Sequence, residues 1–194
     1  MGALELGLLA AMCWGFHDVC VRFISQKTPI SACILTVLIV GLIFHIGLMI
    51  PTKEITVISK SAFVLATIAG VSFVIASFCL YYAFKRGPVK LVAPLIASYP
   101  ILSISWAIWI GTPISKFQIL AVLAIIFGVS IVAVLSDISE EKIPPIGKTI
   151  ALSLIAAIAF ACTFASGQAA AELSPHMSAT LVTRIISIML CAII

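Results

Sequence analysis

Seven long apolar runs dominate the sequence, and their lengths constrain the fold more than any other feature. They cover residues 3–25, 30–50, 61–84, 90–110, 115–135, 148–171 and 176–194. A helix needs about 20 residues to cross the hydrocarbon core of a bilayer. Backbone polar groups inside lipid must be paired within their own segment, which a helix achieves and a lone strand does not. The sequence therefore predicts an all-α polytopic membrane protein with about seven transmembrane helices.

The composition and the breaks between the runs favour the same class. Of the 194 residues, 63% are hydrophobic and 9% are charged, whereas about 25% of a typical soluble domain is charged. A soluble fold would lack the polar side chains needed to cover its surface. Residues that end helices separate the runs, and they are Thr28-Pro29, Pro51, Gly87-Pro88 and Gly111-Thr112-Pro113.

The two ends of the chain match each other when the sequence is shifted by 146 residues. Pro29 then falls on Pro175, and Trp14 falls on Phe160. Five predicted spans separate the two starts, so the second copy would enter the membrane from the opposite face, as in many secondary transporters. Because the last run is still apolar at Ile194, we expect the natural chain to continue. The predicted parts are a five-helix repeat at 1–138, a connecting loop at 139–147 and the start of an inverted second repeat at 148–194.

Several other function classes leave no motif in this sequence. The net charge of +4 is scattered, with no basic run, so we expect no nucleic-acid partner. A P-loop and the GxSxG and HExxH signatures are absent, which argues against an ATP-driven pump and against these hydrolases. The six cysteines lie in apolar runs without a CxxC pair, so we interpret them as packing residues. We expect no cofactor and no metal.

Three segments resemble a known family in their order and spacing. Residues 8–16, LLAAMCWGF, resemble the opening helix of EamA domains in the drug/metabolite transporter superfamily. Residues 82–100 resemble the junction of the third and fourth helices, and residues 118–134 resemble the fifth helix. The resemblance implies ten helices in two inverted halves around a central cavity. It also implies a multi-pass protein of the bacterial inner membrane that exports or exchanges a metabolite.

Charged residues inside the first span are the first candidates for a binding site, because charge at membrane depth is costly. Trp14, Asp18 and Arg22 follow each other at intervals of four and share one helix face, which His17 flanks. One interpretation is a cavity wall in which Asp18 or His17 carries a proton. The other is a structural Asp18–Arg22 pair, with Arg22 reaching the membrane surface. The sequence leaves both open.

A second group of candidates lies in the fourth and seventh runs. Arg184 is nine residues into its run, so it needs a carboxylate, helix-end carbonyls or an anionic substrate. Pro94 and Pro100 each remove a helical hydrogen bond and predict a kink, with Tyr99 beside the second. We expect Trp14, Asp18, Arg22, Tyr99 and Arg184 to line one cavity between the halves.

The predicted function is secondary transport of a small metabolite, such as an amino acid or an organic anion, by alternating access. An excess of two arginines over one nearby aspartate favours an anion. The expected partners are membrane lipid and a small-molecule substrate. A homodimer is possible from the sequence and is not decided by it. Two further classes also stay open. A membrane-embedded enzyme should show clustered His, Asp or Glu near one interface, and a non-transporting scaffold would not need a buried arginine.

Overall fold

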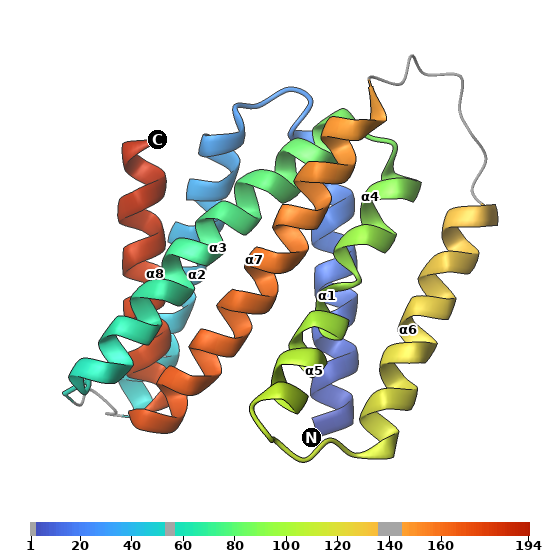
Figure 1. Ribbon diagram of the computed structural model, residues 1–194. Coiled ribbons are helices and arrows are strands. Elements are labelled where there is room, and N and C mark those ends of the chain that lie inside the picture. The colour runs from blue at the N-terminus through green and yellow to red at the C-terminus, as the bar shows by residue number, and fades with distance from the viewer. Residues whose placement is uncertain (1–2, 53–56, 136–144) are drawn as a thin grey trace.

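The computed structural model describes residues 3–52, 57–135 and 145–194, and every regular element within them is a helix (Figure 1). Among these residues, six helical segments are long and apolar enough to cross a membrane, and Lys116–Ile131 forms a shorter apolar helix. The predicted all-α polytopic fold is thereby confirmed. The helices are α1 (Ala3–Ile24), α2 (Ile30–Thr52), α3 (Lys60–Arg86), α4 (Val89–Ile96), α5 (Tyr99–Trp109), α6 (Lys116–Leu135), α7 (Ile146–Leu173) and α8 (His176–Ile193).

The helix pairs α1–α2 and α7–α8 begin and turn in the same way but run in opposite directions. In Figure 1, α1 ascends from the N-terminus and α7 descends from the top of the molecule. The second helix of each pair starts directly after a proline. The carbonyl of that proline accepts a hydrogen bond from the backbone N–H four residues later. These bonds join Cys33 N to Pro29 O and Ala179 N to Pro175 O, both at 3.1 Å.

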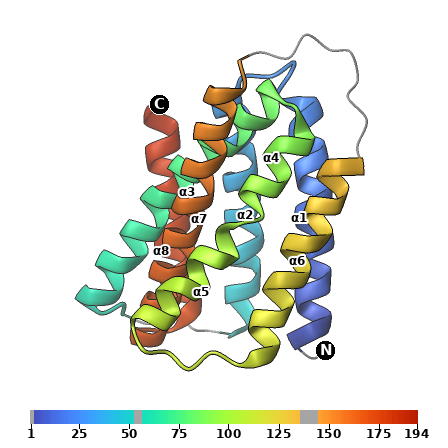
Figure 2. The ribbon, with the colours of Figure 1, turned by 45° about the vertical axis from the view of Figure 1, so that its right-hand side comes forward.

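The predicted run at 90–110 is divided into two helices. Helix α4 ends at Ile96 and α5 begins at Tyr99, and the break lies between Pro94 and Pro100 (Figure 2). Pro100 occupies the first turn of α5, where a missing N–H is tolerated because that donor has no partner inside the helix. The Ser98 hydroxyl donates to Leu95 O at 2.6 Å and stabilises the turn.

Helix α3 is the central element, and α7 and α8 pack along it. Small residues allow the backbones to approach closely, since Ala62, Ala66, Ala69 and Ala83 of α3 are all completely buried. At Gly70 an added Cβ would lie 2.8 Å from the carbonyl oxygen of Thr183 in α8. Only glycine fits this contact without a shift of one helix.

Hydroxyl groups of α7 and α8 fasten both helices to α3. Ser187 Oγ donates to Gly70 O at 3.1 Å, and Thr183 Oγ1 donates to Ala66 O at 3.2 Å. The Thr149 hydroxyl reaches Gly87 O at 3.3 Å. In an apolar surrounding such bonds hold neighbouring helices in register, because water does not compete for the same groups. Both C-terminal helices are therefore held against α3.

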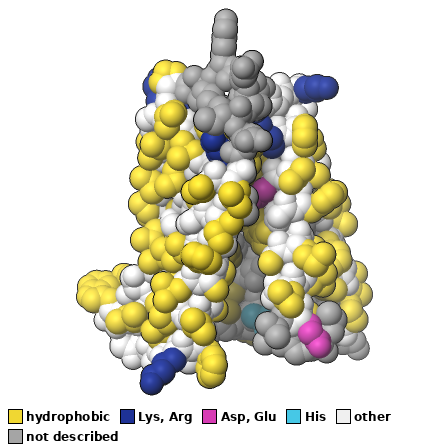
Figure 3. All heavy atoms as spheres, turned by 90° about the vertical axis from the view of Figure 1, so that its right-hand side faces the viewer, with side chains coloured by type: hydrophobic (Ala, Val, Ile, Leu, Met, Phe, Trp, Pro, Cys, Tyr) yellow, Lys and Arg dark blue, Asp and Glu magenta, His cyan; other side chains and the backbone are white. Residues whose placement is uncertain are grey.

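The outer surface is apolar along its length. Figure 3 shows hydrophobic side chains over the helices of one face, with Lys and Arg side chains mainly towards its ends. Many large side chains point outward, among them Phe16, Phe117 and Phe127, with 73%, 83% and 69% of their surface exposed. Lipid tails can cover such a surface at no cost, whereas water cannot.

Candidate functional site

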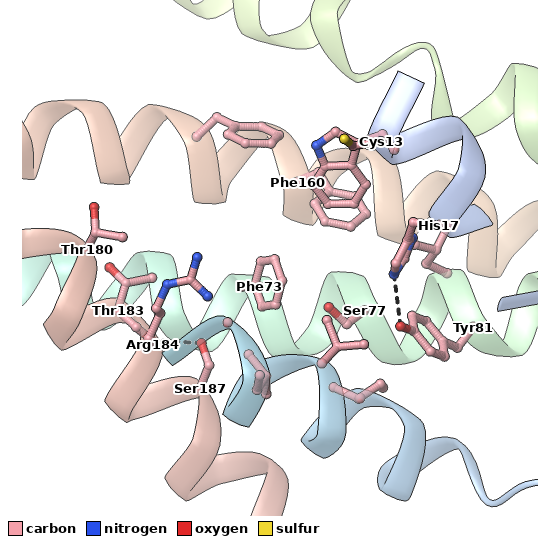
Figure 4. Close-up of a pocket in the computed structure, with 17 residues that line it drawn as sticks. Cys13, His17, Phe73, Ser77, Tyr81, Phe160, Thr180, Thr183, Arg184 and Ser187 are labelled. Carbon is pink, nitrogen blue, oxygen red and sulfur yellow. Dashed lines mark hydrogen bonds between the residues drawn. The ribbon is translucent and has the colours of Figure 1, made fainter. Parts of the chain in front are cut away.

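A cavity of about 490 Å³ lies between the first three helices and the α7–α8 pair. Its walls come from five helices, so the site depends on segments far apart in the sequence (Figure 4). Most of the lining is apolar. The polar and titratable side chains that line it are Cys13, His17, Ser77, Tyr81, Thr180, Thr183, Arg184 and Ser187.

Arg184 supplies the cationic group of the cavity. Its guanidinium points into the cavity toward Phe73 in Figure 4, and it lies against the backbone of Gly41 in α2. Within the described residues, the buried Nε of Arg184 has no hydrogen-bond partner, and no carboxylate pairs with this side chain. A partly buried cation without a counter-ion is costly, and an anionic solute would remove that cost.

A hydrogen-bonded trio lies at the opposite end of the cavity. His17 Nε2 is 3.0 Å from the hydroxyl oxygen of Tyr81, and His17 Nδ1 is 3.1 Å from Asp18 Oδ1. His17 and Tyr81 both line the cavity, whereas Asp18 lies outside the lining. Both ring nitrogens are thus engaged, which fixes the plane of the imidazole.

Aromatic rings form the wall between these two ends. The Phe160 ring stands edge-on to Trp14 and Phe73, with centroids 6.1 and 6.2 Å away. Phe164 lies almost parallel to Phe160, with an interplanar angle of 22°. Edge-on and offset arrangements of this kind are favourable for aromatic pairs, and they leave ring faces available to an apolar solute. The middle of the cavity therefore suits an apolar or aromatic body.

The structure brings three of the predicted site residues to the cavity lining, and these are Trp14, His17 and Arg184. Asp18 is not a lining residue, but its carboxylate is hydrogen-bonded to His17, which is one. Tyr99 lies behind the wall, where its ring is 5.3 Å from that of Phe164. The prolines flank the break between α4 and α5 and are not lining residues.

Arg22 lies outside the cavity lining, at the far end of α1. Its guanidinium donates hydrogen bonds to the carbonyl oxygens of Phe84 and Lys85 at 2.6 and 3.1 Å. These carbonyls belong to the last turn of α3, where unpaired acceptors carry the negative end of the helix dipole. The anion argument from two arginines therefore depends on Arg184 alone.

Several lining residues were not predicted from the sequence. Phe73, Ser77 and Tyr81 follow each other at intervals of four in α3, and Thr183 and Ser187 do the same in α8. Polar residues at this spacing inside an apolar run share one helix face, and that signal could have found the four polar residues of this set. Gly41 carried no such signal, because its role depends on a partner in another helix.

Within the residues that the structure describes, no three His, Cys, Asp or Glu side chains gather closely enough to hold a metal ion. The side chains that line the cavity supply one guanidinium, one imidazole, one phenol, one thiol, four aliphatic hydroxyls and aromatic faces. These groups can hold an anion and can exchange a proton.

Comparison with known proteins gives a family and a relative that are similar to this chain. The sequence model of the EamA-like transporter family matches residues 1–134. An uncharacterized protein of Methanocaldococcus jannaschii is 28% identical over 133 residues, which cover 68% of this chain and 96% of that protein. No solved structure matches the chain.

Proposed function

The chain belongs to the EamA-like transporter family, and on that premise we propose that it carries a small organic anion across the cell membrane by alternating access. Amino acids are included in this class through their carboxylate. The observation that supports this proposal most is the guanidinium of Arg184, which faces the cavity with its Nε unpaired among the described residues. A carboxylate is a planar, two-oxygen partner that a guanidinium can bind through two parallel hydrogen bonds.

The position of the cavity supports transport over simple binding. It lies between α1–α3 and α7–α8, and the helix pairs α1–α2 and α7–α8 run in opposite directions. In transporters with inverted repeats, the substrate site lies between two such parts, which rock around it. A carboxylate on Arg184 would place the rest of the solute against Phe73 and Phe160.

Solute counterflow in liposomes tests the proposal. The purified full chain is reconstituted, and entry of labelled benzoate is measured against an internal pool of unlabelled benzoate. Benzyl alcohol and benzylamine share the ring but are neutral and cationic, so they serve as matched solutes. We expect the protein to raise the rate of benzoate exchange well above the rate in protein-free liposomes. The rates for benzyl alcohol and benzylamine should equal those in protein-free liposomes. A protein that moves none of the three, or only benzylamine, would contradict the anion proposal.

Arg184 variants locate the site. Arg184→Ala should lower benzoate affinity by at least about tenfold, because the pair with the carboxylate is lost. Arg184→Lys should restore part of that affinity if charge alone matters, and little if two parallel hydrogen bonds are needed. Lys116→Ala removes an exposed cation at the start of α6 and is the control. Wild-type exchange by Arg184→Ala would remove Arg184 from the site.

A further inference from the structure

We propose that His17 is a proton-binding site whose protonation favours anion binding in the cavity, so that one proton is carried together with the anion. This inference rests on the proposed anion transport. It is carried by the chain of contacts from Asp18 through His17 to Tyr81, which connects a carboxylate outside the cavity lining with a hydroxyl inside it.

The imidazole can gain a proton without losing either hydrogen bond. In the neutral form, Nδ1–H donates to Asp18 Oδ1, and the Tyr81 hydroxyl donates to Nε2. When a hydronium ion in the cavity gives its proton to Nε2 and is left as water, the imidazolium donates from both nitrogens, and Tyr81 becomes the acceptor. Asp18 stays ionised and Tyr81 keeps its own proton. The charge of the trio changes from one negative charge to zero, and no other bond is formed or broken.

This change has two consequences for the cavity. The Tyr81 hydroxyl hydrogen, no longer used by His17, turns toward the cavity and becomes a donor for an anionic solute. The lost negative charge also lowers the repulsion of that solute, an effect that is strong where water is excluded. Both consequences strengthen the binding of an anion. By linkage, a proton that strengthens anion binding is itself bound more strongly when the anion is present.

Among side chains, histidine is the type suited to proton exchange near neutral pH. The titratable and charged groups near His17 come from several helices. Its own helix contributes Asp18 and, further along, Arg22, whose guanidinium is bound to the backbone carbonyl of Lys85. Helix α3 contributes Tyr81. Helix α2 offers Cys33, near Tyr81. Helix α7 contributes the uncharged Phe160, next to Trp14. Across the cavity, α8 contributes Arg184, which stays charged.

The test is the pH dependence of benzoate binding to the purified full chain. Benzoate stays ionised between about pH 6 and 8, so its own titration does not interfere. With one linked proton, we expect benzoate affinity to rise as the pH falls, by up to about tenfold per pH unit. A pH-indicator dye in weakly buffered solution should report uptake of about one proton per benzoate bound.

Two variants assign the proton to the trio. In His17→Gln, an amide replaces the imidazole, so affinity should become independent of pH, whatever its absolute value. His176→Gln, an exposed histidine at the start of α8, should keep the wild-type slope. Tyr81→Phe removes the hydroxyl that links imidazole and cavity, and it should flatten the slope even if His17→Gln does not fold. Its control is Tyr82→Phe on the exposed side of α3.

The outcomes separate this inference from the proposed function. Benzoate binding that is independent of pH in the wild type would overturn the proton site and leave anion transport intact. An unchanged slope in both His17→Gln and Tyr81→Phe would do the same. Absence of benzoate binding at every pH would instead contradict the proposed function on which the proton site rests.

Discussion

The guanidinium of Arg184 lies so close to Gly41 that a Cβ at position 41 would overlap its Nη1 atom. Gly41 thus gives the arginine of α8 a place against the backbone of α2, 143 residues away in the sequence. The contact orients the charged group toward the cavity rather than along the helix surface. An anion site built on one cation depends on this orientation, because the cation must face the cavity to pair with the solute.

Gly41→Ala should displace the Arg184 guanidinium and weaken benzoate binding by about tenfold, the loss expected for a misplaced charged partner. Equilibrium binding to the purified protein measures this effect. The control is Gly47→Ala in the same helix, since a Cβ there meets nothing within 4 Å. Alanine also favours a helix over glycine by about 1 kcal/mol, so both variants gain intrinsic helix stability. Equal benzoate affinity in the two variants would contradict a role for Gly41.

Arg22→Ala should lower thermal stability rather than anion affinity. Arg22 donates to the last carbonyls of α3, and hydrogen bonds from a charged donor contribute about 1.5–3 kcal/mol. Thermal unfolding in detergent, followed by intrinsic fluorescence, measures the loss. Arg22→Lys should recover part of the stability, because a single ammonium cannot match the guanidinium geometry at two carbonyls. A variant with unchanged melting temperature but lost benzoate binding would place Arg22 in the site instead.

Gly70→Ala should loosen the packing of α8 on α3. The new Cβ would lie 2.8 Å from Thr183 O and 3.0 Å from Ile186 Cβ, and overpacking of this kind costs about 1–3 kcal/mol. The expected result is a lower melting temperature together with weaker benzoate binding, because Arg184 is one residue after Thr183. Gly128→Ala in α6 meets nothing within 4 Å and is the matched control. Equal melting temperatures in the two variants would contradict the close packing at Gly70.

The helices were predictable from local chemistry. A run of about 20 apolar residues in a chain this poor in charge has few alternatives to a membrane helix, because the backbone must pair within the segment. The division of the run at 90–110 into α4 and α5 also has a local cause, since Pro100 cannot donate the bond that would continue α4. Periodicity placed Trp14 and Asp18 on one face of α1 without any knowledge of what that face meets.

The cavity could not be predicted in the same way, because it is made by contacts between helices. Arg22 and Arg184 are both arginines inside apolar runs, yet one binds the end of α3 and the other faces a cavity. Their neighbours separate their roles, since Arg22 meets the end of α3 and Arg184 meets Gly41 of α2. The sequence by itself determined which residues form membrane helices, since lipid leaves the backbone no other choice. The tertiary structure alone decided which charge meets a solute, since that depends on neighbours far away along the chain.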